Sequence, residues 1–328
     1  PKLGQAARPK ASRGDRVVVE ITEWPSRHNA PEGKLVEVIG SPGAPGVDVE
    51  SVIRQYELPN RFPAKVQAEA RRLGGEVTAT DRKGRRDCRK HLVVTIDPVD
   101  ARDFDDAISL ERLEGRRWRL WVHIADVSHY VTPGSTLDKE ARRRGNSTYL
   151  VDRVIPMLPE ALSNELCSLK PGADRLARSV EFVLTESGRV EQAKFHSTVI
   201  CSKCRFTYEE AMAVLERKPA GDIEQMLHDA HHLAQKLRQA RFRSGALNLD
   251  VPERKVLLDA NGRVSEVRRV ENDVSHQLIE EFMLLANETI AREIKRRRAG
   301  AIHRVHEEPD TEKLDNLRAQ AALMGLRA

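Results

Sequence analysis

Five aspartates crowded into ten residues are the part of the sequence best suited to chemistry. They lie in the segment TIDPVDARDFDDAISL, where only Arg102 offsets their charge: Asp97, Asp100, Asp103, Asp105 and Asp106. Carboxylates held a few ångströms apart raise each other's pKa unless a bound cation compensates their charge. Carboxylate, water and phosphate oxygens are the ligands that Mg²⁺ prefers. The cluster therefore indicates a site for one or two magnesium ions.

An acidic surface turn is the alternative, and charge alone favours it because such turns are common. Two observations argue against a free turn. Apolar strand residues flank the acids, which places them at the edge of a core: Val93, Val94 and Ile96 before, Ala107 and Ile108 after. The chain as a whole is basic, with a net charge of +5. A concentrated acidic site in a basic protein is expected where metal ions contact a phosphodiester backbone.

The elements around the cluster predict a mixed α/β domain. Strands are expected at residues 91–96, 118–126, 179–185 and 189–200, and the second alternates Trp118, Leu120, Val122 and Ile124 on one face. Thr207 and Glu210 form a capping box before a helix. Apolar stripes predict two longer helices, over residues 222–243 and about 275–298. The acidic cluster begins where the first of these strands ends.

A smaller β unit is expected before this domain. Residues 1–12 resemble a linker or an added terminal segment, because they show no periodicity. The β-branched runs 16–22 and 34–39, with the following DVESVIRQY, predict a small antiparallel barrel fragment over residues 13–55. A helix between Pro63 and Gly74 joins it to the larger domain, which we place at residues 56–328.

Composition excludes several classes of protein. Hydrophobic residues make up 40% of the 328 residues, and no apolar run approaches a membrane span. Four cysteines in a chain without a secretory signal predict reduced thiols and a cytoplasmic protein. Gly-rich phosphate loops, a serine nucleophile elbow and dinucleotide fingerprints are absent from the sequence, so no nucleotide cofactor is expected.

Long motifs identify a family. TIDPVDARDFDDAI, WVHIADVSHYV, GSTLDKEARRRGNSTYL and VIPMLPEALSNELCSLKPGADRLARSVEF, in this order, resemble the RNB catalytic domain of the ribonuclease II and ribonuclease R family. GDRVVVEITEWPSR, GKLVEVIG and LPNRFP resemble the end of the family's second cold-shock OB-fold, nearer to ribonuclease R. The resemblance covers residues 13–328. It implies a magnesium-dependent 3′→5′ exoribonuclease that hydrolyses single-stranded RNA to nucleoside 5′-monophosphates.

The resemblance also assigns roles to the acidic residues. Asp97, Asp103 and Asp106 match family metal ligands. Asp105 matches the aspartate on which family catalysis depends most, through metal or through the attacking water. Asp100 lies in the motif without a ligand role. Two metal ions would lower the pKa of the water and stabilise the leaving 3′ oxygen.

RNA contacts are implied at several other positions. Tyr149 matches the tyrosine that stacks on the 3′-terminal base, although its spacing alone indicates an ordinary half-buried tyrosine. Tyr208 and Glu280 match residues near the scissile end; without the resemblance they would be assigned to core and to a solvated helix face. Leu249 stands where family members carry an aromatic clamp, and a leucine lacks the π-face.

A basic run precedes Tyr149, in the sequence RRRGNS. Such runs are usually solvated surface. Because of its place beside the expected base-stacking residue, we expect this run to contact RNA phosphates, chiefly through Arg143 and Arg144.

Parts of the family pattern do not occur in the 328 residues. The Ser-Pro-Ile-Arg-Arg-like motif, whose arginine contacts the scissile phosphate, and the C-terminal OB-fold are both missing from the sequence. The chain is therefore expected to be the middle of a family protein. The alternative function is an RNA-binding module or an inactive fragment; a third is an active site completed by a separate chain. The presence of all four aspartates argues against divergence from catalysis.

Two further patterns allow competing interpretations. Cys88-Arg-Lys-His91 and Cys201-Ser-Lys-Cys204 could form a zinc site, but paired spacing is common by chance and isolated reduced cysteines are favoured. His123 and His129 flank Asp126, where packing and hydrogen bonding are favoured over a catalytic dyad.

Overall fold

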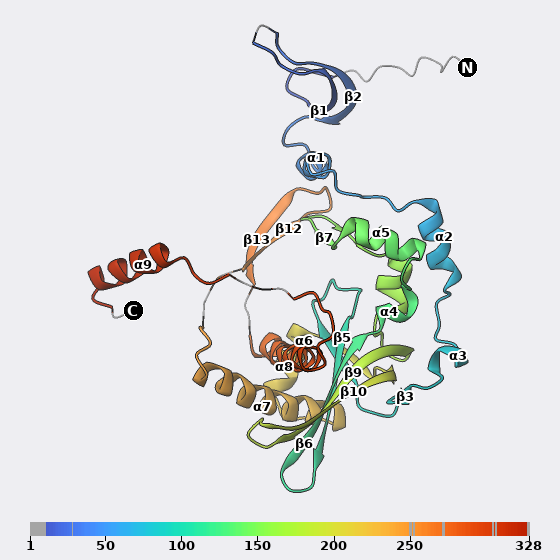
Figure 1. Cartoon of the computed structure of the whole chain (residues 1–328), viewed down its shortest axis with the longest axis vertical. Coiled ribbons are helices and arrows are strands. Elements are labelled where there is room, and N and C mark those ends of the chain that lie inside the picture. The colour runs from blue at the N-terminus through green and yellow to red at the C-terminus, as the bar shows by residue number, and fades with distance from the viewer. Residues whose placement is uncertain are drawn as a thin grey trace. The chain divides into compact units, whose positions relative to one another are not determined.

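The computed structural model describes residues 11–27, 29–248, 251, 253–270, 273–303, 305 and 307–326. Its residues divide into two units, one that ends at Ala286 and one that begins at Asn287. Figure 1 traces the elements along the chain. The acidic segment and all the described strands belong to the first unit.

A seven-stranded sheet forms the centre of the first unit. Its order is β11-β4-β5-β6-β9-β10-β3. Neighbouring strands are antiparallel except for the pairs β11–β4 and β10–β3, which are parallel. The strands are β3 (Arg86–Asp87), β4 (Val94–Asp97), β5 (Asp106–Leu113), β6 (Arg117–Ala125), β9 (Asp174–Thr185), β10 (Val190–Cys201) and β11 (Cys204–Thr207). The acidic segment thus connects two adjacent central strands, β4 and β5.

The described residues also form helices and three further two-stranded sheets. The helices are α1 (Val47–Gln55), α2 (Ala64–Arg72), α3 (Ala79–Arg82), α4 (Val127–Tyr130), α5 (Thr136–Arg144), the π-helix η1 (Ala161–Leu166), α6 (Tyr208–Leu215), α7 (Asp222–Arg243), α8 (Val274–Arg296) and α9 (Thr311–Leu323). Three two-stranded sheets are β1 (Arg16–Glu23) with β2 (Glu32–Gly40), β7 (Thr148–Tyr149) with β8 (Val154–Ile155), and β12 (Glu253–Leu258) with β13 (Val264–Val270). In the described residues no helix is both long and apolar enough to span a membrane.

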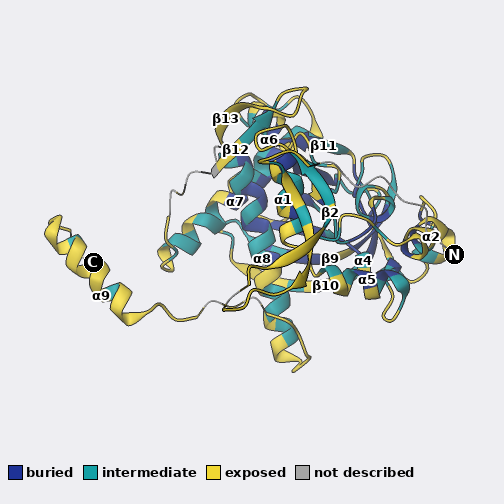
Figure 2. Cartoon of the chain, turned by 90° about the horizontal axis from the view of Figure 1, so that it is seen from above, coloured by how far each residue is buried: buried dark blue, intermediate teal, exposed yellow. Residues whose placement is uncertain are grey.

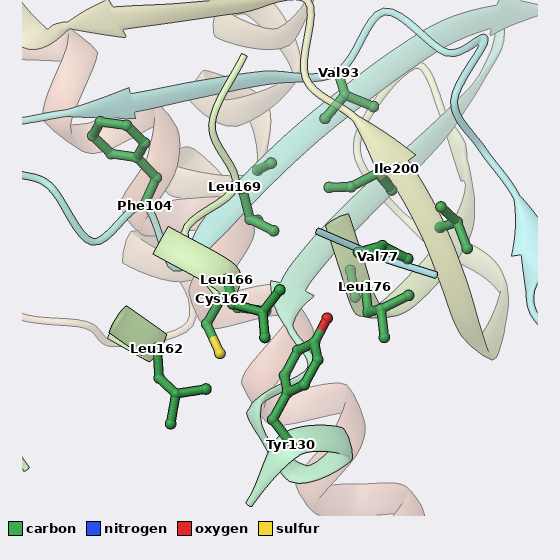
Figure 3. Close-up of a cluster of buried hydrophobic side chains, with 14 of the residues drawn as sticks. Val77, Val93, Phe104, Tyr130, Leu162, Leu166, Cys167, Leu169, Leu176 and Ile200 are labelled. Carbon is green, nitrogen blue, oxygen red and sulfur yellow. The ribbon is translucent and has the colours of Figure 1, made fainter. Parts of the chain in front are cut away.

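Both faces of the central strands are buried. Trp118, Leu120 and Val122 of β6 are buried as the alternation predicts, but Trp121 and His123 on the opposite face are buried too. One face contributes to a cluster that includes Leu162, Leu166 and Cys167 of the π-helical segment beside Tyr130 and Leu176 (Figure 3). Helices α6 and α7 contact β11, β4 and β5. The ends of β4 and β5 are therefore held from several directions.

Several predicted elements are confirmed. Helix α7 spans residues 222–243 as expected, α8 begins one residue before the expected start, and the Thr207–Glu210 capping box is present. Burial marks the inward stripe of α7, whereas no residue of α9 is buried (Figure 2).

The expected small β unit also contains a helix. The segment after the first hairpin forms α1, which contacts β1 and β2, because Val47, Glu50, Ser51 and Arg54 recur at helical spacing and are buried or half-buried. Between the two long helices the chain forms the β12–β13 hairpin, which the apolar pattern did not predict. Few apolar residues alternate along β12 and β13, so hydrophobic periodicity did not indicate these strands.

Candidate active site

The acidic segment lies at one edge of the central sheet. Asp97 is the last residue of β4 and only 8% exposed, and Asp106 is the first residue of β5 and half-buried. Asp103 is half-buried on the connecting loop, and Asp105 is exposed. The antiparallel pairing of β4 with β5 brings Asp97 and Asp106 to the same edge. The structure thus brings together the four predicted carboxylates around one loop.

Contacts from distant parts of the chain fix the shape of this loop. The Ser168 hydroxyl donates to the carbonyl of Arg102 at 2.8 Å and accepts from the Phe104 backbone N–H at 3.1 Å. The Leu169 N–H donates to the Phe104 carbonyl at 2.8 Å. Arg205 of β11 donates to the carbonyls of Pro98 and Val99. The loop is therefore held at both of its ends.

Asp100 faces a different partner. Its carboxylate accepts from Lys255 of β12 at 2.8 Å, and both side chains are about half exposed. The hydrogen bond from Lys255 is the main reason that the pKa of Asp100 lies below its usual value. Weak burial of the carboxylate opposes this shift. Asp100 is thereby engaged away from the other carboxylates, in agreement with the absence of a predicted ligand role.

Burial and mutual repulsion raise the pKa values of three other acids of the loop. Burial, with the charges of Asp106 and Asp103, raises the pKa of Asp97 to about 7, and the charge of Arg205 opposes this shift. Burial and the charge of Asp105 raise the pKa of Asp106 to about 6. Desolvation and Asp103 raise the pKa of Asp105. Ionisation of one carboxylate therefore makes ionisation of its neighbours less favourable.

The donor set suits a hard divalent cation. One carboxylate oxygen of Asp97 and one of Asp106, Oδ2 in each, is buried without a hydrogen-bond partner among the described residues. A buried carboxylate oxygen in this state requires a cation or a proton. Within the described residues, no group of three or more aspartate, glutamate, histidine or cysteine side chains is arranged to bind a metal ion. Mg²⁺ fits this arrangement because it commonly takes one or two carboxylates and completes its shell with water and phosphate.

Two tyrosines flank the carboxylates. Tyr149 on β7 is 70% exposed, and partial burial with the charges of Asp103 and Asp105 raises the pKa of its hydroxyl. Tyr208 is the first residue of α6, and burial with the charges of Asp106 and Asp97 raises its pKa to about 12. Both predicted tyrosines are thus within electrostatic reach of the acidic loop, Tyr149 open to solvent and Tyr208 half-buried.

Other predicted RNA contacts are placed less directly. Glu280 on α8 accepts from Arg241 of α7 at 3.5 Å and lies one helical turn after His276. Leu249 lies outside the described residues. Arg143 is 56% exposed at its side chain and pairs with Glu140. These positions stay predictions.

Arg144 is placed inside the protein. Its side chain is 1% exposed, and it donates to Glu140, to the Pro156 carbonyl and to the Arg61 carbonyl. The guanidinium carbon lies 3.6 Å from the centre of the Phe62 ring. These contacts use the guanidinium to tie α5 to the chain before α2 and to β8, so it is not offered to a phosphate.

Neighbouring side chains decide between the alternative interpretations of the cysteine and histidine patterns. The four cysteines are free thiols, and within the described residues they do not join His91 or other side chains in a metal-binding group. Asp126 accepts from Arg85 and Ser128, His129 pairs with Asp81, and the His123 ring contacts the Ser179 hydroxyl. Packing and hydrogen bonding therefore account for this segment, and the histidines form no dyad with Asp126.

A cleft of about 800 Å³ opens beside the β7–β8 hairpin, away from the aspartates. Arginines from four segments line it: Arg54 of α1, Arg61 before α2, Arg71 of α2 and Arg153 of the β7–β8 turn. Arg54 and Arg153 pair with acids, but Arg61 and Arg71 are exposed and have no ionic partner among the described residues. Val154 and Ile155 form part of its wall, and Val154 is paired with Tyr149. The hairpin therefore separates this basic cleft from the acidic loop.

Sequence reasoning missed the groups that hold the loop and Tyr208. Ser168, Arg205 and Lys255 gave no signal, because each acts through a contact distant in the sequence. Asp273 and His276 could have been found, since Asp-Val-Ser-His at the start of a helical stripe is typical of a helix N-terminus.

The fold and the site agree with the family to which the sequence points. The RNB domain model matches residues 85–327 and the cold shock domain model matches residues 3–63. The chain therefore belongs to the RNB domain family.

Individual relatives are consistent with this membership. Ribonuclease R of Thermotoga maritima is 44% identical over 97% of this chain and 46% of its own length. Mycoplasma genitalium RNase R, solved in complex with double-stranded RNA, superposes with a TM-score of 0.89 at 27% identity, over 95% of this chain and 56% of that one. The same protein with ribose methylated single-stranded RNA gives a TM-score of 0.88. The chain spans about half the length of these relatives.

Proposed function

We propose that this chain carries the catalytic domain of a magnesium-dependent 3′→5′ exoribonuclease that releases nucleoside 5′-monophosphates from single-stranded RNA. The observation that carries the proposal is the pair of buried carboxylates, Asp97 and Asp106, each with an unpartnered oxygen at one sheet edge between two tyrosines. The ribonuclease R relatives support it, and the solved relatives bound to RNA support RNA as the partner.

Each residue has a separate part in this proposal. Asp97, Asp103 and Asp106 would hold the magnesium. When bound, the ions supply charge that makes water a stronger acid and neutralises the reacting phosphate. Asp105 is exposed at the rim of the site, where it can orient the attacking water and accept a proton from it. The exposed ring of Tyr149 can stack on the terminal base without regard to its identity.

The basic cleft supports an approach route for the rest of the strand. Arg61 and Arg71 offer unpaired charges to phosphates, and part of the wall of the cleft is the hairpin that carries Tyr149. A strand that follows this wall would bring its 3′ end to the acidic loop.

The test is digestion of 5′-labelled single-stranded RNA by the chain, with magnesium and with EDTA, and with products resolved by length. We expect a magnesium-dependent ladder that shrinks to a short end product. Asp105→Asn should abolish cleavage while RNA affinity stays within a few fold. Asp100→Asn is the matched control, since Asp100 is paired with Lys255 and should retain cleavage.

Two outcomes would contradict the proposal. An Asp105→Asn protein that still degrades RNA would remove Asp105 from catalysis. Binding without shortening by the unaltered chain would favour the RNA-binding module over the exoribonuclease.

A further inference from the structure

Tyr208 is held in place by two structural constraints on its backbone. Thr207 pairs with Asp97 in the parallel β11–β4 register, so the residue after it emerges beside the acidic edge. The Thr207–Glu210 capping box then fixes the start of α6, through hydrogen bonds of 2.8 and 3.0 Å. The backbone therefore directs Tyr208 toward the carboxylates, but it does not fix the rotation of the ring.

His276 supplies the missing constraint on the ring. Its imidazole stacks on Tyr208 with ring centres 3.7 Å apart and an interplanar angle of 15°. Rings in such close parallel contact limit rotation about the Tyr208 side-chain bonds. His276 comes from α8, so the stack joins two helices that would otherwise leave Tyr208 free to turn.

Asp273 in turn orients His276. The His276 Nδ1 lies 2.9 Å from Asp273 Oδ1. Burial alone would raise the pKa of Asp273, but hydrogen bonds from Ser275 and His276 hold it below its usual value, so the group is a carboxylate that only accepts. The Nδ1 must therefore carry the proton. The same Asp273 oxygen accepts from the backbone of Ser275 at 2.9 Å at the start of α8, which fixes the carboxylate itself.

The hydroxyl of Tyr208 is available to a ligand. No hydrogen bond of this hydroxyl is found among the described residues, although it is near enough to Asp97 and Asp106 to feel their charges. A neutral phenol beside carboxylates can donate a hydrogen bond to an oxygen of a bound phosphate.

We propose that Asp273 and His276 are positioning residues that hold the Tyr208 ring so that its hydroxyl donates to the phosphodiester at the acidic site. This inference rests on the proposed exoribonuclease function. In this proposal His276 acts only through Tyr208. Its effect on cleavage can therefore be measured separately from its effect on the stability of the fold.

The first measurement does not depend on activity. The chain has four tyrosines, and incorporation of 3-fluorotyrosine gives each a ¹⁹F resonance, with that of Tyr208 identified from Tyr208→Phe. The Tyr208 resonance should shift in His276→Ala, because the ring current of the stacked imidazole is lost, and should stay shielded in His276→Phe. His232→Ala, an exposed histidine on α7, is the matched control. An unchanged Tyr208 resonance in His276→Ala would overturn the positioning role.

The second measurement is a double-mutant cycle in RNA cleavage by the same chain. Tyr208→Phe should lower kcat roughly 100-fold, as for loss of one transition-state donor, and His276→Ala about tenfold with KM little changed. His276→Phe should recover most of the rate. The double variant should be no slower than Tyr208→Phe alone, because His276 has nothing left to position.

Additive losses in the double variant would overturn the inference, since His276 would then act by another route. If the unaltered chain does not cleave RNA, the proposed function fails, but the ¹⁹F result still decides whether His276 positions Tyr208.

Discussion

At the scale of single residues, Tyr149 offers the most direct test of RNA contact. Its ring is 70% exposed beside the acidic loop, where it can stack on a terminal base. We predict that Tyr149→Ala lengthens the end product of digestion, because the last nucleotides lose about 1–3 kcal/mol of stacking. Products resolved on a sequencing gel give the length. Tyr56→Ala, which removes a tyrosine of similar exposure, should leave the products unchanged.

His123 makes stability depend on pH. Burial, with a smaller effect of His91, lowers its pKa to about 3, well under the value in an unfolded chain. The unfolded state therefore binds the proton first, so stability is full above about pH 6.5 and falls as pH drops toward 3. Between about pH 7 and about pH 5.5, the free energy of unfolding should fall about 1 kcal/mol more in the unaltered protein than in His123→Gln. Urea titrations at both pH values measure this difference, and equal losses would contradict it.

How much of the site could be predicted differed between residues. The four aspartates lie within ten residues, and their crowding, together with the apolar residues that flank them and the basic charge of the chain, indicated a cation. Their flanking tyrosines required the family motifs, because one tyrosine in a helix or strand has no distinctive spacing. Arg144 shows the limit of charge patterns: three successive arginines look alike in sequence, yet Arg142 is 74% exposed and Arg144 1% exposed at the side chain. Only the packing of α5 against Phe62 and Pro156 separates them.

At the scale of elements, Arg144 joins three segments. We predict that Arg144→Ala lowers the free energy of unfolding by about 3 kcal/mol, because it leaves Glu140 with one fewer partner and two carbonyls without donors. Arg142→Ala, at an exposed position on another face of α5, should change it by less than about 0.5 kcal/mol. Chemical denaturation compares the two variants. Similar effects from both would mean that the Arg144 contacts add little.

Elements were predicted best where periodicity was long. The stripe of α7 and the capping box of α6 are local features, and both are confirmed. Helix α1 was missed because Val47, Val49 and the intervening Asp48 alternate over a short distance as a strand would. The two-residue strands of β7 and β8 are too short for any period, although they carry Tyr149.

At the scale of the whole molecule, the basic cleft should govern affinity for RNA. We predict that Arg61→Ala and Arg71→Ala each weaken binding at low salt and lower the slope of log affinity against log salt by about 1, because each removes one phosphate contact. Arg72→Ala is the control, because Arg72 follows Arg71 on α2 but does not line the cleft. Fluorescence anisotropy with labelled single-stranded RNA over a range of salt concentrations measures both quantities. Equal slopes in all variants would exclude the cleft as a route for RNA.

The link from Arg205 to Pro98 spans 107 residues of chain, and β11 pairs with β4 across a similar interval. Contacts this distant in sequence form late, since the intervening chain must be ordered before they close. During synthesis, the acidic loop leaves the ribosome well before β11 and α6 exist to hold it or to bring Tyr208 beside it. A growing chain thus bears its carboxylates before the elements that hold them, so the proposed site is completed only after β11 and α6 have been made.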